Sequence, residues 1–429
     1  RSQSPVRDPA TILRRPVCGN ATAAPRTASG PPGSILPTRK RLDDQRCIAL
    51  QRDTRVTPRT ILLAGGGHAH VEVLRRFGAR PEPGVSLVLV SPDRFTPYSG
   101  MLPGLVAGHY SHDQAHIDLE PLAERAGARF VRDRVAALDV DGHAATTASG
   151  ERIAFDLVAL DVGSVPDMRF PGAREHATGV KPVDAFLARW ERVRTAAVAG
   201  RVGRIAVVGG GAGGVEVLLA MHHRLSKDAP ARVPRFVLVS DRTNLPGGAN
   251  RALLAKLHAA GVELHLGRGA ERFDAQGVTL AGGERVAADV VFCATPATAA
   301  PWLAASGVAC DDRGFVRIDD HLRSPSHPRV FAAGDCASQI GRVHPRSGVY
   351  AVRQGPPLAA NLRAAATGTA LATYVPQGRS LALVSTGGRH AVAVWGRWSV
   401  AGRWAWRWKD RIDRRFMKRY RFDERERAS

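Results

Sequence analysis

The sequence is poor in cysteine and lacks long apolar runs. Its 429 residues include five cysteines, and no two of them have a CxxC or a metal-ligand spacing. We therefore expect neither a disulfide framework nor a bound metal, and a reducing compartment is the default. No run of 18 apolar residues occurs, so the sequence predicts no membrane-spanning helix.

Acidic residues are also scarce, and the formal net charge is +22. The excess of positive charge lies at the two ends: residues 1–60 carry 12 Lys and Arg against 4 acidic residues, and residues 397–429 carry 12 against 5. This distribution indicates charged tails or a surface patch. Nucleic acid is not predicted as a partner, because no nucleic-acid-binding motif accompanies the charge.

Residues 1–57 show little apolar periodicity and are rich in Arg, Pro, Ser, Thr and Gly. We predict a disordered extension for them. The sequence starts at Arg1 rather than Met, so a fragment or a processed product is an alternative. A transit segment is another, although four acidic residues argue against it.

Two glycine-rich segments each follow a short apolar run. Residues 65–70 (Gly-Gly-Gly-His-Ala-His) follow the run 61–64, and residues 209–214 (Gly-Gly-Gly-Ala-Gly-Gly) follow the run 205–208. This pattern is typical of the turn between a buried strand and a helix, where backbone N–H groups approach a pyrophosphate. Two such turns predict a protein that holds two dinucleotides, and the economical reason is to pass a hydride between them.

The order of these motifs predicts an α/β fold. We expect two Rossmann-like dinucleotide-binding domains, the second inserted in the first, and a small C-terminal α+β region. Residues 58–180 and 301–370 are assigned to the first domain, 181–300 to the second, and 371–429 to a basic, aromatic interface region. Predicted helices cover 68–77, 183–198, 250–260 and 348–366, and predicted strands include 85–90, 236–240, 263–266, 289–293 and 330–333. The chain is expected to return to the first sheet near residue 315.

The first glycine turn departs from the usual pattern at its third position, which is His70. This imidazole would either pack beneath the turn or lie near the pyrophosphate. The acidic residue expected to bind a ribose is displaced as well, because the second strand is followed by Ser91-Pro92-Asp93. Ser91 or Asp93 would have to bind the adenosine ribose.

The second turn has glycine at all three positions, Gly209, Gly211 and Gly214. The following strand ends at Ser240-Asp241-Arg242, where Asp241 would favour NADH and Arg242 would favour NADPH. Glu216 lies on the first turn of the next helix. It either compensates the helix dipole or contacts a proton or a substrate beside a flavin.

A third element is Gly334-Asp335, directly after the apolar run 330–333. Its carboxylate suits a sugar-alcohol chain such as the ribityl of FAD, or it caps the next helix. Its distance from Gly65 in the sequence matches a flavin that stretches between two distant segments.

With these motifs the chain resembles the two-dinucleotide flavoprotein superfamily, and within it the type II NADH dehydrogenases. It is most similar to the FAD-containing oxidoreductase domain found alone or fused to selenide, water dikinase. The resemblance covers about residues 60–421. It is carried by the segments 65–73, 96–104, 349–356 and 408–417.

The resemblance implies that FAD binds in the first fold and NAD(P)H in the second. It implies catalytic roles for Glu216 and Gln354, which would lie near the flavin. Two family motifs are altered here: Asp161-Val162-Gly163 and Ala294-Thr295-Pro296 each stand where Ala-Thr-Gly is usual. The predicted FAD contacts are Gly65, Gly67, His68, Ala69, Ser91, Asp93, Pro97, Gly163, Gly334 and Asp335. The predicted NAD(P)H contacts are Gly209, Gly211, Gly213, Gly214, Ser240, Asp241 and Thr295.

The electron acceptor is constrained by the lack of cysteine between Cys47 and Cys293. Disulfide reductases of this superfamily, and sulfide:quinone oxidoreductases, need cysteines there. Quinone, dioxygen or a small soluble acceptor is therefore expected. The alternative is a flavin-binding redox scaffold or sensor with little turnover, which would serve selenium metabolism.

The segment 395–420 mixes tryptophans with arginines. Such a mixture suits a membrane interface with anionic lipids, and a cytoplasmic protein with peripheral membrane contact would follow. The alternative is a small sheet and helix packed on the flavin domain or at a homodimer interface. The alternation of Trp404, Trp406 and Trp408 predicts a strand there.

Overall fold

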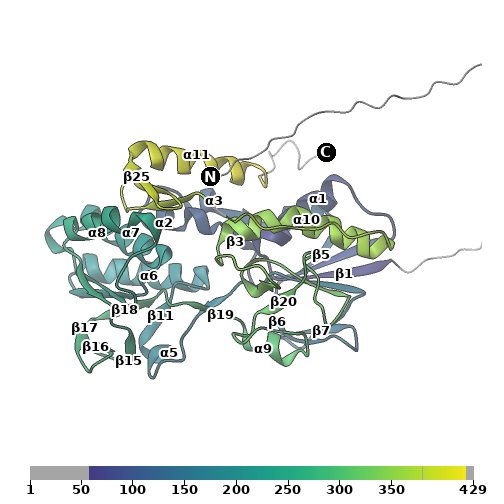
Figure 1. Cartoon of the computed structure of the whole chain (residues 1–429), viewed down its shortest axis with the longest axis horizontal. Helices are drawn as coiled ribbons and strands as arrows, with labels where there is room; N and C mark the ends of the chain where they lie inside the picture. The colour runs from purple at the N-terminus through teal and green to yellow at the C-terminus, as the bar shows by residue number, and fades with distance from the viewer. Residues whose placement is uncertain (1–57, 379, 422–429) are drawn as a thin grey trace, which may run out of the picture. The chain divides into compact units, whose positions relative to one another are not determined.

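The computed structural model describes residues 58–378 and 380–421, so the predicted disordered extension lies outside the described residues. Two parallel five-stranded sheets form its framework (Figure 1). Their strands are mostly uninterrupted apolar runs, as expected for sheets covered on both faces. The first sheet has the order β21 (Val330–Ala332), β9 (Leu157–Leu160), β1 (Arg59–Ala64), β2 (Val85–Val90) and β5 (Ala128–Val131).

The second sheet lies between β9 and β21 in the sequence, so its domain is inserted in the first. This finding confirms the predicted fold class. Its order is β11 (Ala177–Gly179), β18 (Val290–Cys293), β12 (Arg204–Val208), β13 (Arg235–Ser240) and β14 (Glu263–Leu266). The first of these, β11, falls within the range 58–180 assigned to the first domain but pairs in the second sheet.

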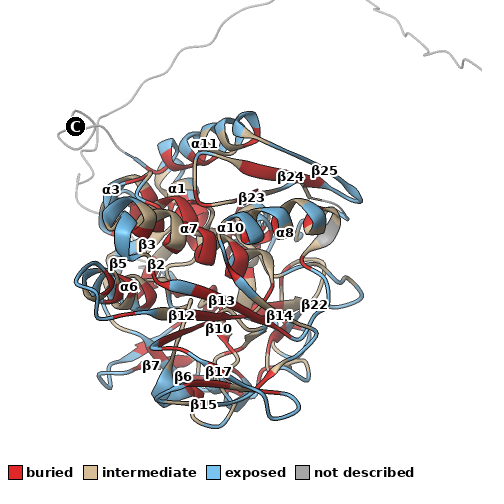
Figure 2. Cartoon of the chain, turned by 90° about the vertical axis from the view of Figure 1, so that its left-hand side faces the viewer, coloured by how far each residue is buried: buried red, intermediate tan, exposed pale blue. Residues whose placement is uncertain are grey.

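Alternation along β12 shows how the second sheet is covered. Ile205 and Val207 belong to the core shared with Phe186 of α6 (Val183–Val198) and with α7 (Ala212–Asp228) and α8 (Asn250–Ala259). Ala206 and Val208 belong to a second core on the opposite face. That face is covered by the antiparallel strands β15 (Ala270–Asp274), β16 (Gly277–Leu280) and β17 (Arg285–Ala287). Figure 2 shows the buried strands β12 and β13 between these two layers.

The first sheet is covered by α1 (His68–Ala79) and α10 (Gly348–Thr367), which contact each other (Figure 1). The chain rejoins this sheet at β21, so the expected return near residue 315 is wrong. The segment at that point is β20 (Val316–Ile318), which pairs with β22 (Ala337–Gln339) in a separate two-stranded sheet.

The C-terminal region is a three-stranded antiparallel sheet followed by a helix. The strands are β23 (Ala382–Ser385), β24 (Ala391–Trp395) and β25 (Trp398–Gly402), and the helix is α11 (Arg403–Lys418). The strand predicted from the alternating tryptophans is therefore wrong. Trp404 and Trp408 are one helical turn apart and exposed, and Trp406 is half-buried. No helix in the described ranges is long and apolar enough to cross a membrane.

Candidate functional site

The two glycine turns are structurally equivalent. In the first sheet Ala64 pairs with Leu160, and in the second Val208 pairs with Cys293. The first glycine of each turn has a positive φ, +98° at Gly65 and +126° at Gly209. A Cβ on either glycine would come closer than 3.0 Å to the backbone carbonyl of the residue after the neighbouring strand. Both positions therefore require glycine.

The second turn is open toward solvent. A Cβ on Gly211 or Gly213 would meet nothing within 4 Å, and no side chain caps the start of α7. Gly214 differs, because its Cβ would come closer than 3.0 Å to the carbonyl oxygen of Gly209. Close packing at Gly214 and free space at Gly211 are the two conditions that a dinucleotide turn needs.

The first turn is filled by Asp161, the residue that follows β9. Its Oδ2 accepts hydrogen bonds from the backbone N–H groups of Ala69 at 2.8 Å and His70 at 3.3 Å. A Cβ on Gly67 would come closer than 3.0 Å to this carboxylate. Burial raises the pKa of Asp161 to about 7, against the opposing effect of the two hydrogen bonds. The sequence marked this position only as a departure from the family motif.

His70 is packed beneath the first turn, which is one of its two expected positions. The residue is 0% exposed, and its Nδ1 lies 2.6 Å from the carbonyl oxygen of Gly65. Because a carbonyl only accepts, Nδ1 carries the proton and donates. Burial lowers the pKa of His70 to about 4, so the imidazole is neutral at pH 7.

The strand ends beside the turns place serine inside and aspartate outside. Ser91 and Ser240 are buried. Ser91 packs against Gly66 of the first turn, and Ser240 packs against Gly210 of the second. The Ser91 hydroxyl donates to the carbonyl of Asp93 at 3.1 Å, so the serine also shapes the strand end. Asp93 and Asp241, the two aspartates predicted to bind a ribose, are exposed.

Asp335 lies in a short 3-10 helix, η4 (Gly334–Cys336), and pairs with a lysine that the sequence analysis missed. Lys181 Nζ donates to Asp335 Oδ2 at 2.5 Å, and Ser164 Oγ lies 3.3 Å from the same oxygen. Asp335 lies inside η4, and the N-cap of the next helix, α10, is Ser347, so Asp335 does not cap that helix. Lys181 lies 154 residues away in sequence, and no local pattern links the pair.

Gln354 joins α10 to this segment. Its Oε1 accepts the Gly334 N–H at 2.7 Å, and the residue is 0% exposed. Two buried nitrogens, Nε2 of Gln354 and Nε2 of His68, have no hydrogen-bond partner within the part of the chain that the structure describes. Burial lowers the pKa of His68 to about 4. Unpaired buried nitrogens at this spot fit a polar ligand such as the flavin that the sequence predicts.

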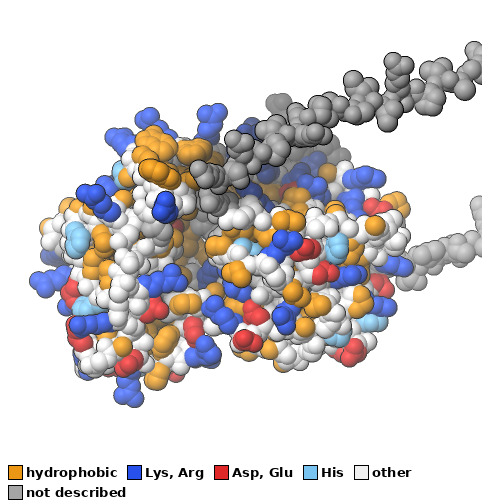
Figure 3. Space-filling view, in the orientation of Figure 1, with side chains coloured by type: hydrophobic (Ala, Val, Ile, Leu, Met, Phe, Trp, Pro, Cys, Tyr) orange, Lys and Arg blue, Asp and Glu red, His pale blue; other side chains and the backbone are white. Residues whose placement is uncertain are grey.

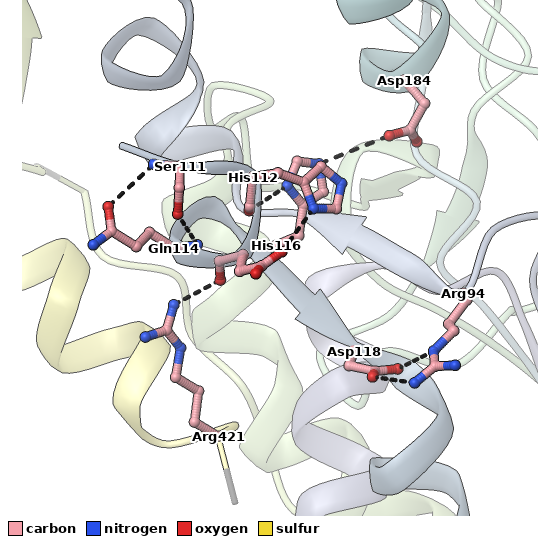
Figure 4. A network of polar contacts seen from close by, with 9 residues as sticks. Arg94, Ser111, His112, Gln114, His116, Asp118, Asp184 and Arg421 are labelled. Atoms are coloured by element: carbon pink, nitrogen blue, oxygen red, sulfur yellow. Dashed lines mark hydrogen bonds and ion pairs between the residues drawn. The ribbon is translucent and has the colours of Figure 1, made fainter. Parts of the chain in front are cut away.

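The segment 94–110 contains a short strand, β3 (Phe95–Pro97), that pairs with β4 (His116–Asp118). Figure 4 shows the contacts at its base: Arg94 binds Asp118 through two hydrogen bonds, and His116 lies 3.8 Å from Asp184 of α6. These contacts fix the segment that follows, which carries Tyr98. Pro97 is half-buried in β3.

Helix α11 packs on this segment. The ring of Tyr98 stacks on Phe416 at a centroid distance of 4.3 Å, and burial, together with the nearby Asp413 carboxylate, raises the pKa of Tyr98. Lys409 Nζ donates to Asp413 Oδ2 at 2.6 Å and to the carbonyl of Gly100. Asp413 is only 4% exposed, and burial raises its pKa.

Glu216 of α7 faces the same cluster. Its Oε1 accepts the Ser385 N–H at 2.7 Å. Burial raises the pKa of Glu216 to about 7, Lys409 lowers it, and Asp413 raises it. The charges of Lys409 and Asp413, two residues that were not predicted, thus act on the pKa of the predicted Glu216. Their spacing of four residues on one helix was the available signal.

The remaining predicted contacts lie at the ends of strands. Gly163 has a φ of +69°, and a Cβ there would meet nothing within 4 Å. The hydroxyl of Thr295 donates to the carbonyl of Asp167 at 3.0 Å.

The described cysteines are unpaired thiols, and two of them are buried. Cys336 Sγ donates to the carbonyls of Ala333 at 3.2 Å and Leu160 at 3.4 Å. Burial raises the pKa of Cys336 to about 12, and that of Cys293 to about 12 as well. Such thiols are poor nucleophiles at neutral pH.

The sequence profile of the pyridine nucleotide-disulphide oxidoreductase family matches residues 59–355, well over half of the chain. The chain belongs to this family. An NADH dehydrogenase-like protein of Mycobacterium tuberculosis is 30% identical over 226 residues, which are 50% of this chain and 56% of that protein. The chain therefore aligns with little more than half the length of that relative.

A second relative aligns with this chain over a greater length. The demethylphylloquinone reductase of Synechocystis sp. is 26% identical over 356 residues, covering 78% of this chain and 86% of that protein. Among solved structures, the sulfide:quinone oxidoreductase of Aquifex aeolicus superposes with a TM-score of 0.72 at 15% identity, covering 85% of this chain and 91% of the other. That likeness concerns the fold alone.

Proposed function

We propose that this family member is an FAD-dependent NAD(P)H oxidoreductase. The observation that carries the proposal is the pair of equivalent strand–glycine–helix turns in one chain, at Gly65 and Gly209. The open second turn suits the pyrophosphate of NAD(P)H. A Cβ on Gly334 would come closer than 3.0 Å to the Asp161 carboxylate of the first turn, so this turn lies beside the segment of Asp335 and Gln354, which suit the flavin. The relative described as NADH dehydrogenase-like supports the same activity.

Residues of the first domain would hold FAD and orient it. Bound FAD would supply the redox chemistry, because it accepts a hydride and releases electrons singly or in pairs. Asp335, held by Lys181, would bind the sugar-alcohol chain. Gln354 and His68 would offer their unpaired Nε2 atoms to the flavin. The N-terminus of α10 would place partial positive charge beside the flavin.

We propose a quinone as the electron acceptor. A quinone that takes up two electrons also takes up two protons, so a site for it needs a proton donor. Glu216 has a pKa raised to about 7 by burial, and the charges of Lys409 and Asp413 act on it. The demethylphylloquinone reductase relative supports this class of acceptor. The links to selenium metabolism and to a homodimer stay predictions from the sequence.

The purified chain with FAD, kept free of oxygen, provides the test. We expect NADH or NADPH to bleach the flavin absorbance within seconds, and a short-chain quinone to restore it. Reduction without reoxidation by quinone would contradict the acceptor but keep the dehydrogenase. A flavin that stays oxidised with both nucleotides would contradict the enzyme and favour the redox scaffold.

We propose in addition that the C-terminal region binds a membrane surface. Trp395, Trp398, Trp404 and Trp408 are between 44% and 80% exposed. Exposed arginines accompany them in the turn before β25, at Arg397, and on α11, and Figure 3 shows hydrophobic side chains among Lys and Arg in this region. Exposed tryptophan with arginine suits an anionic lipid surface, where a quinone is found.

Replacing the four tryptophans by alanine should weaken binding to vesicles that contain anionic lipid. Each indole that no longer inserts should cost about tenfold in the partition constant. Vesicle sedimentation with phosphatidylglycerol and phosphatidylcholine measures it. Val343→Ala is the control, since Val343 is fully exposed but lies outside this region. Equal binding by the variant and the unchanged chain would contradict the membrane proposal.

A further inference from the structure

The two glycine turns provide an internal comparison. Asp161 directly follows β9, and Ala294 directly follows the equivalent strand β18. The backbone N–H of each bonds the last residue of the central strand: Asp161 bonds Ala64, and Ala294 bonds Val208. The two residues thus occupy the same position. One carries a carboxylate and the other a methyl group.

The carboxylate lies where a phosphate is expected. The second glycine of a dinucleotide turn is the place of close approach to the pyrophosphate, and the first helical N–H groups are its donors. In the first turn Asp161 packs against that glycine, Gly67, and accepts the N–H groups of Ala69 and His70. In the second turn the space over Gly211 is open. Asp161 is 3% exposed, so the carboxylate is held inside the turn.

We propose that Asp161 is an internal substitute for phosphate, which competes with the pyrophosphate of FAD for the N-terminus of α1 and so determines the affinity for FAD. The inference rests on the proposed FAD site and is independent of the electron acceptor. Two anions at one helix N-terminus repel each other, and the partial positive charge there stabilises one of them. FAD therefore binds best when the Asp161 side chain is neutral or absent.

Affinity for FAD then depends on pH through the groups around Asp161. From α1, His68 and His70 are neutral, because burial lowers the pKa of each to about 4. From η4, Asp335 is paired with Lys181, and Cys336 is a thiol whose pKa burial raises to about 12. Gln354 of α10 carries no charge.

Asp161 is therefore the group whose charge is expected to change near neutral pH. Its pKa is raised by burial to about 7, so it is protonated below that pH and ionised above it. FAD should bind tightly below pH 7. Its affinity should fall as the pH rises, approaching tenfold for each unit.

The experiment measures FAD binding to the full chain, stripped of flavin, by quenching of flavin fluorescence at pH 6.0 and pH 8.5. For the unchanged chain we expect the dissociation constant to rise at least about tenfold between these values. Asp161→Asn keeps the size of the side chain, and Asp161→Ala makes the first turn like the second. Both variants should bind FAD more tightly at pH 8.5 and lose the pH dependence.

A reciprocal variant sharpens the test. Ala294→Asp places a carboxylate at the second turn, and it should weaken NADH binding by about tenfold without changing the FAD isotherm. Circular dichroism spectra of all chains check the folding. Equal FAD affinity and equal pH dependence in the Asp161 variants would overturn the inference while the FAD site stands. Failure of every chain to bind FAD would overturn the proposed function itself.

Discussion

Replacing Gly214 by valine will prevent NAD(P)H from reducing the flavin while FAD stays bound. A side chain at this position collides with the carbonyl oxygen of Gly209, closer than 3.0 Å already at its Cβ, and with the Ala294 methyl group at 3.1 Å. Gly209 belongs to the turn itself and Ala294 directly follows β18 of the second sheet, so neither can move easily. The start of α7 must move away, and its N–H groups lose their direction toward the pyrophosphate.

The expected loss is at least about 100-fold in the rate constant of flavin reduction at low NADH, equivalent to about 2.7 kcal/mol. Stopped-flow absorbance without oxygen measures this rate. Gly378→Val is the matched control, because a Cβ there meets nothing within 4 Å and Gly378 lies in neither glycine turn. Reduction of the Gly214→Val chain at the normal rate would show that NAD(P)H binds elsewhere.

Much of the framework could be predicted because short apolar runs alternate with glycine turns. The strands Val85–Val90 and Glu263–Leu266 and the helix Val183–Val198 have the predicted bounds. Burial in the sheet at Val85–Val90, and on one face of the helix Val183–Val198, leaves a clear apolar pattern in the sequence. Glu263–Leu266 is an edge strand without buried residues, and leucine alternates with polar residues along it. Both glycine turns likewise lie between a strand and a helix, as their spacing predicts.

What could not be predicted depends on contacts between distant segments. Lys181 pairs with Asp335, which lies 154 residues further along the sequence. Asp161 fills the first glycine turn, which lies about 90 residues earlier in the sequence. Neither partner has a local sequence pattern. The alternation of tryptophans at 404–408 led to the wrong prediction of a strand, because three alternating residues also fit the end of a helix. In α11 the buried positions Asp413, Phe416 and Met417 follow helical spacing instead.

Replacing Glu216 by glutamine will slow the transfer of electrons to quinone and leave flavin reduction by NADH unchanged. Hydride transfer needs no proton from Glu216, whereas quinone reduction does. Loss of a positioned acid costs about 100-fold or more in rate. Stopped-flow reoxidation of the reduced chain by a short-chain quinone measures the step. Glu175→Gln changes an exposed carboxylate on α5 (Ala173–His176) in the same way and should have no effect.

The pH dependence distinguishes proton donation from a structural role of Glu216. Its pKa is raised to about 7, so the donor is present below pH 7, and the reoxidation rate should fall as the pH rises through that value. With glutamine the rate should be low and independent of pH. The pKa is raised from an ordinary value of 4.5, so ionisation of Glu216 lowers the stability of the fold as the pH rises from about 4.5 to 7, and this loss is complete above pH 7. The glutamine variant should therefore melt no earlier than the unchanged chain at pH 8.

The positive charge of Lys409 lowers the pKa of Glu216. Lys409→Met removes that charge, so the midpoint of the reoxidation profile should move to higher pH. A purely structural role for Lys409, through Gly100 and Asp413, would reduce the rate at every pH without moving the midpoint. A shifted midpoint therefore identifies Lys409 as the residue that sets the proton affinity of Glu216, and an unshifted one contradicts that role.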